Sequence, residues 1–137
     1  MALSGKIAII TGSNQGFGSE IARVMARDGA TVVVTYWDEE GAVGRMKAEQ
    51  VAEEVNSDLI VAFDVRERGS VQALMKRVHD MYGRIDILVN NAGINIVGDF
   101  DKITEEQWNA VLAVDLKGVF ICCQEVLSYM PSGGRII

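Results

Sequence analysis

Short apolar runs alternate along the chain with longer segments in which apolar residues recur at helical spacing. The runs that predict strands cover residues 6–10, 31–35, 59–63 and 85–89. The segments that predict helices between them cover residues 19–27, 39–55 and 70–82. The first run is apolar on both faces, which is typical of a central strand covered by helices above and below. Strands that alternate with amphipathic helices predict right-handed β-α-β units and a parallel sheet.

The predicted helices have recognisable ends and apolar positions. Gly29 is placed to take the left-handed cap of the first helix, and Gly83 ends the third. The second helix carries Val43, Met46, Gln50, Val51 and Val55 along its length. The apolar face of the third helix consists of Val71, Leu74, Met75, Val78, Met81 and Tyr82. We expect the lone histidine, His79, to be an exposed residue of this helix.

The last third of the chain is predicted to be mostly helical. Thr104 and Gln107 have the spacing of a capping box, which starts a helix through Trp108, and we expect Trp108 to pack there. A helical pattern continues over residues 111–130, and residues 133–137 indicate a turn and the beginning of a fifth strand. Residues 111–127 are apolar on nearly every side, whereas a helix at a solvated surface shows one apolar stripe. We therefore expect this helix to face the sheet on one side and a partner on the other.

These elements predict one α/β domain over residues 1–137, organised as a three-layer α/β/α sandwich around a parallel sheet. The chain is 49% hydrophobic and has a formal charge of −6 with no strongly basic stretch, so nucleic-acid binding has little support. No apolar run approaches the length of a membrane span. Cys122 and Cys123 are adjacent and lack metal-ligand spacing, which favours buried thiols in a reduced cytoplasm and no metal site.

A glycine-rich stretch follows the first predicted strand and opens the first helix. Its sequence is Thr11-Gly12-Ser13-Asn14-Gln15-Gly16-Phe17-Gly18. Glycines let the backbone turn sharply and let a pyrophosphate approach the main chain, while the helix start points free N–H groups at the anion. The motif alone is weak evidence, because glycine-rich turns also occur for structural reasons.

Three further polar segments follow the other predicted strands. They are residues 36–38 after the second strand, Asp64 after the third, and residues 90–93 after the fourth. In an open parallel sheet, ligands bind beyond the carboxyl ends of the strands. The agreement of four loops at one edge therefore strengthens the interpretation of residues 11–18 as a phosphate cradle.

The order and spacing of three signatures carry a family resemblance over essentially the whole chain. They are Thr11-Gly12-x-x-x-Gly16-Phe17-Gly18, then Asp64-Val65, then Gly83-x-Ile85-Asp86-Ile87-Leu88-Val89-Asn90-Asn91-Ala92-Gly93-Ile94. With these signatures, the chain resembles the N-terminal half of a short-chain dehydrogenase/reductase. The resemblance implies a Rossmann-type doubly wound parallel sheet that is truncated after about its fifth strand.

The resemblance implies a role for each matching residue. The cofactor's pyrophosphate and adenosine ribose would be bound by Gly12, Ser13, Asn14, Gln15, Gly16, Phe17 and Gly18. Asp64 would accept from the adenine amino group, with Val65 against the ring. The path from the ribose to the nicotinamide would be lined by Asn91, Ala92 and Gly93, with Ile94 nearby. Asp86 and Asn90 would tie the fourth strand to its neighbours.

The cofactor preference depends on the end of the second strand. An acidic side chain there accepts from the ribose 2′-hydroxyl of NAD, whereas arginine pairs with the 2′-phosphate of NADP. Tyr36 stands at the acid's position, Asp38 follows two residues later, and Gln15 stands where NADP-using members often carry a basic residue. No lysine or arginine is near either site, and Asp38, Glu39 and Glu40 would repel a phosphate. The sequence therefore favours NAD over NADP.

Family members transfer a hydride between the nicotinamide and a small alcohol or carbonyl substrate. They use a serine, a Tyr-x-x-x-Lys pair and an asparagine, and neither the pair nor the serine is found here. Asp115 stands at the asparagine position. We therefore expect an N-terminal fragment that is inactive alone and forms a homo-oligomer or aggregates. The alternative is a non-catalytic dinucleotide-binding or interaction module.

Overall fold

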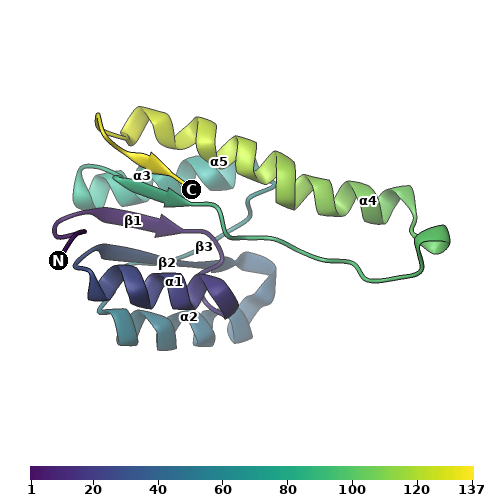
Figure 1. Ribbon diagram of the computed structural model, residues 1–137, viewed down its shortest axis with the longest axis horizontal. Helices are drawn as coiled ribbons and strands as arrows, with labels where there is room; N and C mark the ends of the chain where they lie inside the picture. Colours follow the sequence, from purple (N-terminus) through teal and green to yellow (C-terminus); the bar gives the residue numbers. More distant parts are fainter.

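The computed structural model describes residues 1–137, and its centre is a parallel sheet (Figure 1). Its five strands are β1 (Ile7–Ile10), β2 (Thr31–Trp37), β3 (Ile60–Phe63), β4 (Ile87–Val89) and β5 (Arg135–Ile136). Their spatial order is β3-β2-β1-β4-β5. The chain thus builds outward from β1 in one direction and then crosses to the other side of it. This reversal creates a topological switch point between β1 and β4.

Helices cover both faces of the sheet. They are α1 (Gly16–Arg27), α2 (Gly41–Val55), α3 (Arg68–Tyr82), α4 (Glu105–Leu112) and α5 (Val119–Val126). As Figure 1 shows, α1 and α2 lie on one face, α3 and α5 lie on the other, and α4 projects beyond the sheet. The predicted three-layer, doubly wound α/β/α architecture is therefore confirmed. No helix is long and apolar enough to cross a membrane.

The central strand divides its side chains between two cores. Ile7 and Ile9 belong to the core under α3 and α5, whereas Ala8 and Ile10 belong to the core under α1 and α2. Successive side chains of a strand point to opposite faces, so a strand buried on both sides must be apolar at every position. This requirement explains why the first run is apolar on both faces.

The buried face of α2 consists mainly of small residues. Val43 and Met46 are 57% and 63% exposed, while Gly44, Ala48 and Ala52 are buried together with Val51 and Val55. Small side chains let α2 approach the sheet and α1 closely. Hydrophobicity alone therefore does not identify the packed positions of this helix.

Most of the predicted apolar face of the third helix, α3, is buried. Val71, Leu74, Met75 and Val78 are fully buried, but Met81 is half exposed. His79 is not the exposed residue that the sequence suggested. It is partly buried, its ring packs 5.1 Å from the Tyr129 ring, and its Nδ1 has no hydrogen-bond partner.

The C-terminal helical region is continuous but not uniform. Thr104 and Gln107 form the predicted capping box, with the Thr104 Oγ1 accepting from the Gln107 N–H at 3.2 Å and the Gln107 Oε1 accepting from the Thr104 N–H at 2.9 Å. A π-helical turn, Ala113–Gly118, joins α4 to α5. Trp108 is 61% exposed, so it does not pack at the helix start as expected.

Helix α5 is apolar on two sides, as predicted. Ile121 and Val126 are buried against the sheet, whereas Phe120 is exposed, as is Leu127 directly after the helix. Of the two thiols, only Cys122 is fully buried, and this burial, with Cys123 beside it, raises its pKa to about 12. The structure has no cluster of side chains that could hold a metal ion.

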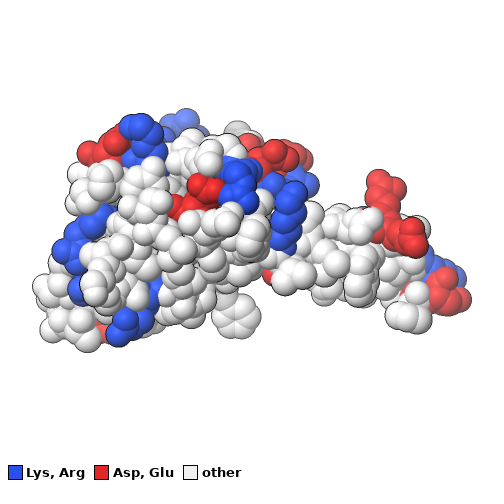
Figure 2. Space-filling view, turned by 90° about the horizontal axis from the view of Figure 1, so that it is seen from above, with Lys and Arg blue, Asp and Glu red and all other residues white.

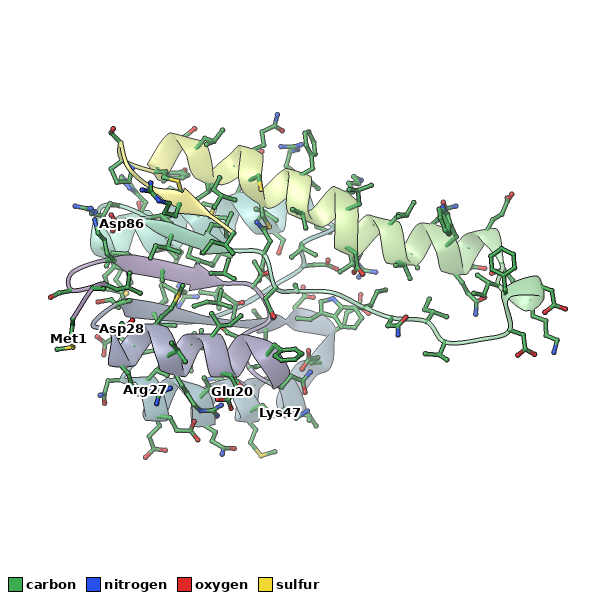
Figure 3. The ribbon with its side chains drawn as sticks, in the orientation of Figure 1. Met1, Glu20, Arg27, Asp28, Lys47 and Asp86 are labelled. Atoms are coloured by element: carbon green, nitrogen blue, oxygen red, sulfur yellow. The ribbon has the colours of Figure 1, made fainter.

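Asp86 ties β4 to β1, as the sequence suggested. Its Oδ2 accepts from the Ile7 N–H at 3.0 Å and from the Arg84 Nε at 2.9 Å, and its carbonyl accepts from Arg135 of β5. Asn90 joins β4 to the chain end through the carbonyl of Ile137, 3.2 Å from its Nδ2. In Figure 3, Asp86 lies at the amino-terminal edge of the sheet, where Met1 and Asp28 also lie.

Candidate functional site

A cavity of about 330 Å³ lies at the carboxyl edge of the sheet, bordered by the segments that follow β1, β2, β3 and β4. The sequence predicted that the four polar segments after these strands lie together at this edge of the sheet. Ten of the predicted site residues line it: Gly12, Asn14, Gln15, Phe17, Tyr36, Asp64, Val65, Asn91, Ala92 and Gly93. Five others lie outside the lining: Ser13, Gly16, Gly18, Asp38 and Asp115. Six residues of the lining were not in the predicted set: Trp37, Glu40, Phe63, Arg66, Ile94 and Val114.

The glycine-rich stretch turns directly into α1, which begins at Gly16 and not at residue 19 as the sequence suggested. Gly12 and Gly16 have φ values of +67° and +56°, a conformation that side chains with a Cβ rarely adopt. The N–H groups of Gly16, Phe17 and Gly18 have no acceptor within the chain. Free N–H groups at a helix start, beside a backbone without side chains, suit a diphosphate group.

Ser13 holds the turn in place and is fully buried. Its Oγ accepts from the Thr35 N–H of β2 at 2.9 Å. The Thr35 Oγ1 in turn accepts from the Gly12 N–H at 3.0 Å and donates to the Ile10 carbonyl at 2.8 Å. These bonds fix the turn to the neighbouring strand, so the Ser13 hydroxyl is directed to β2 and not to the cavity.

The loop after β4 is bonded to the end of β1. Asn91 Nδ2 donates to the carbonyls of Thr11 and Gly12, at 2.9 and 3.2 Å. The Thr11 Oγ1 accepts from the N–H groups of Asn91 and Ala92, at 2.9 and 2.8 Å. The two sides of the switch point are therefore held at a fixed separation, which keeps the cavity open between them.

Asp64, at the end of β3, is buried in a hydrogen-bonded unit with Arg66 and Trp37. Arg66 Nε lies 2.9 Å from the Asp64 Oδ2, the Arg66 guanidinium stacks 5.2 Å from the Trp37 ring, and Trp37 Nε1 donates to Asp64 at 3.2 Å. Burial disfavours the Asp64 carboxylate, but the bonds from Arg66 and Trp37 outweigh it and lower the pKa of Asp64. Asp64 is therefore an ionised acceptor, and its side chain, Arg66 and Trp37 together form one wall of the cavity.

Cations stand closer to this site than the sequence suggested, so the expectation that no lysine or arginine is near was wrong. Arg66 lines the cavity, and Lys47 of α2 donates through Nζ to the Gln15 Oε1 at 2.6 Å. Figure 3 shows Lys47 on the same side of the sheet as the carboxyl ends of the strands, far from Asp86 and Met1 at the opposite edge. The contact between Lys47 and Gln15 links segments that are far apart in the sequence, whereas Arg66 is only two residues from its partner Asp64.

The acidic residue that reaches the cavity after β2 is Glu40. Asp38 and Glu39 precede it in a 3-10 turn, Asp38–Glu40, and neither lines the cavity. Glu40 Oε2 accepts from Asn14 Nδ2 at 2.8 Å, which draws the carboxylate toward the glycine-rich turn.

A family model described as short chain dehydrogenase matches residues 6–137. The chain belongs to the short-chain dehydrogenase/reductase family. A structure titled as a short chain dehydrogenase from Burkholderia cenocepacia in complex with NADP superposes with a TM-score of 0.90 at 32% identity, over 99% of this chain and 55% of that one.

Two curated relatives are named as a dehydrogenase subunit and as a reductase. The subunit BbsD of (2S)-((R)-hydroxy(phenyl)methyl)succinyl-CoA dehydrogenase from Thauera aromatica is 35% identical over 139 residues, covering 100% of this chain and 55% of the relative. The 3-oxoacyl-(acyl-carrier-protein) reductase FabG of Thermotoga maritima is 37% identical over 131 residues, covering 95% of this chain and 52% of the relative. The chain thus spans about half the length of the curated relatives it matches.

In this short-chain dehydrogenase/reductase chain, Asp115 lies in the π-helical turn, on the side of the cavity formed by the loop after β4. Its Oδ1 accepts from the Ile94 N–H at 2.9 Å, and a Cβ at Gly93 would lie 3.4 Å from the same oxygen. A π turn widens the helix and changes the direction of its side chains, and such turns are frequent at functional sites. Asp115 therefore holds the loop after β4 in place but does not itself line the cavity.

Proposed function

We propose that this chain binds a nicotinamide dinucleotide and forms the cofactor-binding half of an oxidoreductase that acts on a small alcohol or carbonyl compound. The observation that carries the proposal is the convergence of four strand ends on one cavity, beside a glycine turn with free N–H groups at Gly16, Phe17 and Gly18. A bound nicotinamide would accept or donate the hydride of such a reaction.

Each part of the cavity would contact one part of the dinucleotide. The free N–H groups of residues 16–18 would hold the pyrophosphate, and Asp64 and Val65 would contact the adenine. Asn91, Ala92 and Gly93 would line the way from the ribose to the nicotinamide. Asp115 would keep that loop in place through the Ile94 N–H.

We expect NAD to be preferred over NADP. Glu40 is an acidic residue on the cavity lining, and a 2′-phosphate would be repelled by its carboxylate. The two nearby cations already have partners, because Lys47 donates to Gln15 and Arg66 pairs with Asp64 and Glu39.

Titration of the protein with NAD, followed by tryptophan fluorescence and by calorimetry, tests the proposal. Trp37 lines the cavity, whereas Trp108 is exposed on α4 and does not line it. Binding should therefore change the fluorescence of the Trp108→Phe variant and leave that of Trp37→Phe almost unchanged. Absence of calorimetric binding by both NAD and NADP at millimolar concentration would refute the proposal.

A second candidate function is a dinucleotide-binding module without catalysis. Within these 137 residues no tyrosine is followed four positions later by a lysine, since Tyr36, Tyr82 and Tyr129 are followed by Glu40, Asp86 and Gly133. We expect the 137-residue chain to bind NAD but not to oxidise NADH with carbonyl substrates. Turnover by this chain alone would contradict that expectation.

A further inference from the structure

Resting on the function proposed above, we propose that Glu40 is the residue that selects the dinucleotide. Its carboxylate accepts from the 2′-hydroxyl of the adenosine ribose and repels the phosphate that NADP carries at that oxygen. The selecting acid thus comes from the turn after β2, four residues beyond Tyr36, and not from the strand end itself.

Glu40 is held in a defined position on the cavity lining without a cation beside it. Its Oε2 accepts from Asn14 Nδ2 at 2.8 Å, and its Oε1 accepts no hydrogen bond from the chain. It forms no ion pair, in contrast to Glu39, which pairs with Arg66 at 3.1 Å. One oxygen therefore fixes the carboxylate, and the other is free to accept from a ligand hydroxyl, with the full negative charge unneutralised.

Gly44 of α2 provides the space that this position requires. A Cβ at Gly44 would overlap the Glu40 Cβ and would lie 2.8 Å from the Glu40 Oε2 and 2.9 Å from the Tyr36 Cδ2. The φ of Gly44 is not in the left-handed region, so the backbone conformation does not demand a glycine there. A glycine inside a helix lowers helix stability, and here it makes room for the carboxylate beside Asn14.

The cations of this region do not face the same space. Lys47 lies outside the cavity lining and donates to the Gln15 side chain. Arg66 lines the cavity but is bound to Asp64 and Glu39, on the wall formed by Trp37. A phosphate on the ribose would therefore meet the Glu40 carboxylate before it met an available cation.

The test is a calorimetric titration of the protein with NAD and with NADP, in the wild type and in four variants. We expect the wild type to bind NAD about tenfold or more tightly than NADP, since a hydrogen bond to a charged group has about this effect on an equilibrium. Glu40→Gln keeps the size and the bond to Asn14 but removes the charge, and it should reduce the NAD/NADP affinity ratio by about tenfold. Gly44→Ala should reduce the ratio as well, by displacing Glu40.

The matched control is Glu39→Gln, which removes a neighbouring acid outside the lining and should leave the ratio within about twofold of the wild type. Thermal unfolding of each variant verifies that it is folded. A wild type that binds NADP as tightly as NAD, or an unchanged ratio in Glu40→Gln, would overturn the assignment of Glu40 and leave the proposed function intact. Binding of neither dinucleotide would overturn both.

If the wild type prefers NADP and Lys47→Met removes that preference, the lysine is the selecting residue and the assignment of Glu40 is wrong. A ratio that changes little in Lys47→Met, together with the loss in Glu40→Gln, supports the assignment.

Discussion

Gly18 and Asn91 meet at the switch point of the sheet, where the start of α1 lies against the loop after β4. A Cβ at Gly18 would overlap the carbonyl oxygen of Gly12 and would lie 2.5 Å from Asn91 Nδ2. The same Asn91 Nδ2 donates to the carbonyls of Thr11 and Gly12. Gly18 is therefore required by the close approach of three segments and not by an unusual φ.

Gly18→Ala should destabilise the protein by about 1–3 kcal/mol, because the added methyl overlaps backbone that cannot move without breaking the Asn91 bonds. It should also weaken NAD binding, since the turn and the helix start would separate. Gly69→Ala is the matched control: Gly69 lies in the first turn of α3, and a Cβ there meets nothing within 4 Å. Urea unfolding and calorimetry measure both effects. Equal stability of the two variants would contradict the packing argument.

Thr11→Val should cost about 1–3 kcal/mol of unfolding free energy, because it removes the acceptor of the Asn91 and Ala92 N–H groups while keeping the side-chain shape. Thr11→Ser retains the hydroxyl and should cost clearly less. Urea unfolding compares the variants, and amide hydrogen exchange should be faster at residues 91 and 92 in Thr11→Val alone. If the valine variant is as stable as the serine variant, the two bonds contribute nothing to stability.

Stability should fall as the pH drops below about 4, in part because of Asp86. Burial disfavours the Asp86 carboxylate, but bonds from Arg84 and the Ile7 N–H outweigh it, so the pKa of Asp86 is below its value in the unfolded chain. The unfolded state then binds more protons, and the stabilisation is complete above the unfolded pKa, about 3.9, and lost as the pH falls through the folded one.

Asp86→Asn should therefore flatten the decline of stability in acid and lower the stability at pH 7 by about 1–3 kcal/mol. Urea unfolding between pH 3 and pH 7 measures both effects. Asp101→Asn, at an exposed position with no ion pair or hydrogen bond, should leave the curve of the wild type unchanged. If the free energy of unfolding falls as steeply in acid in Asp86→Asn as in the wild type, the decline is caused by other carboxylates.

The outer face of the C-terminal helical region should bind a second copy of the chain. Leu112, Leu116 and Phe120 line a shallow apolar groove there, and Phe120 is 57% exposed. Figure 2 shows that the part of the molecule that projects beyond the sheet with α4 has few charged side chains on this face, except toward its outer end. An exposed apolar surface of this kind favours association.

Phe120→Glu should therefore lower the mass measured by light scattering, because association would have to remove a carboxylate from water. Val43→Glu places the same charge on an exposed apolar position of α2 and should leave the mass unchanged. A wild type that remains a monodisperse monomer at high concentration would rule out this interface.

The sequence by itself determined the class of the fold and the edge of the sheet at which the cavity lies. Runs apolar on both faces can be buried only between two helical layers, and parallel strands bring the loops after them to one edge. Residues 11–18, Asp64 and residues 90–93 could therefore be placed together from their positions in the chain, before any distance was known. The capping box of Thr104 and Gln107 could also be predicted, because it depends only on residues three positions apart.

Only the tertiary structure decided which side chains face that cavity. The contacts of Glu40 with Asn14 and of Lys47 with Gln15 join segments that no local pattern relates. The same holds for the buried small residues of α2, because a close approach between helix and sheet depends on the shapes of both surfaces. Periodicity reports which side chains avoid water, whereas the partner of a polar side chain depends on where the folded chain places the other segments.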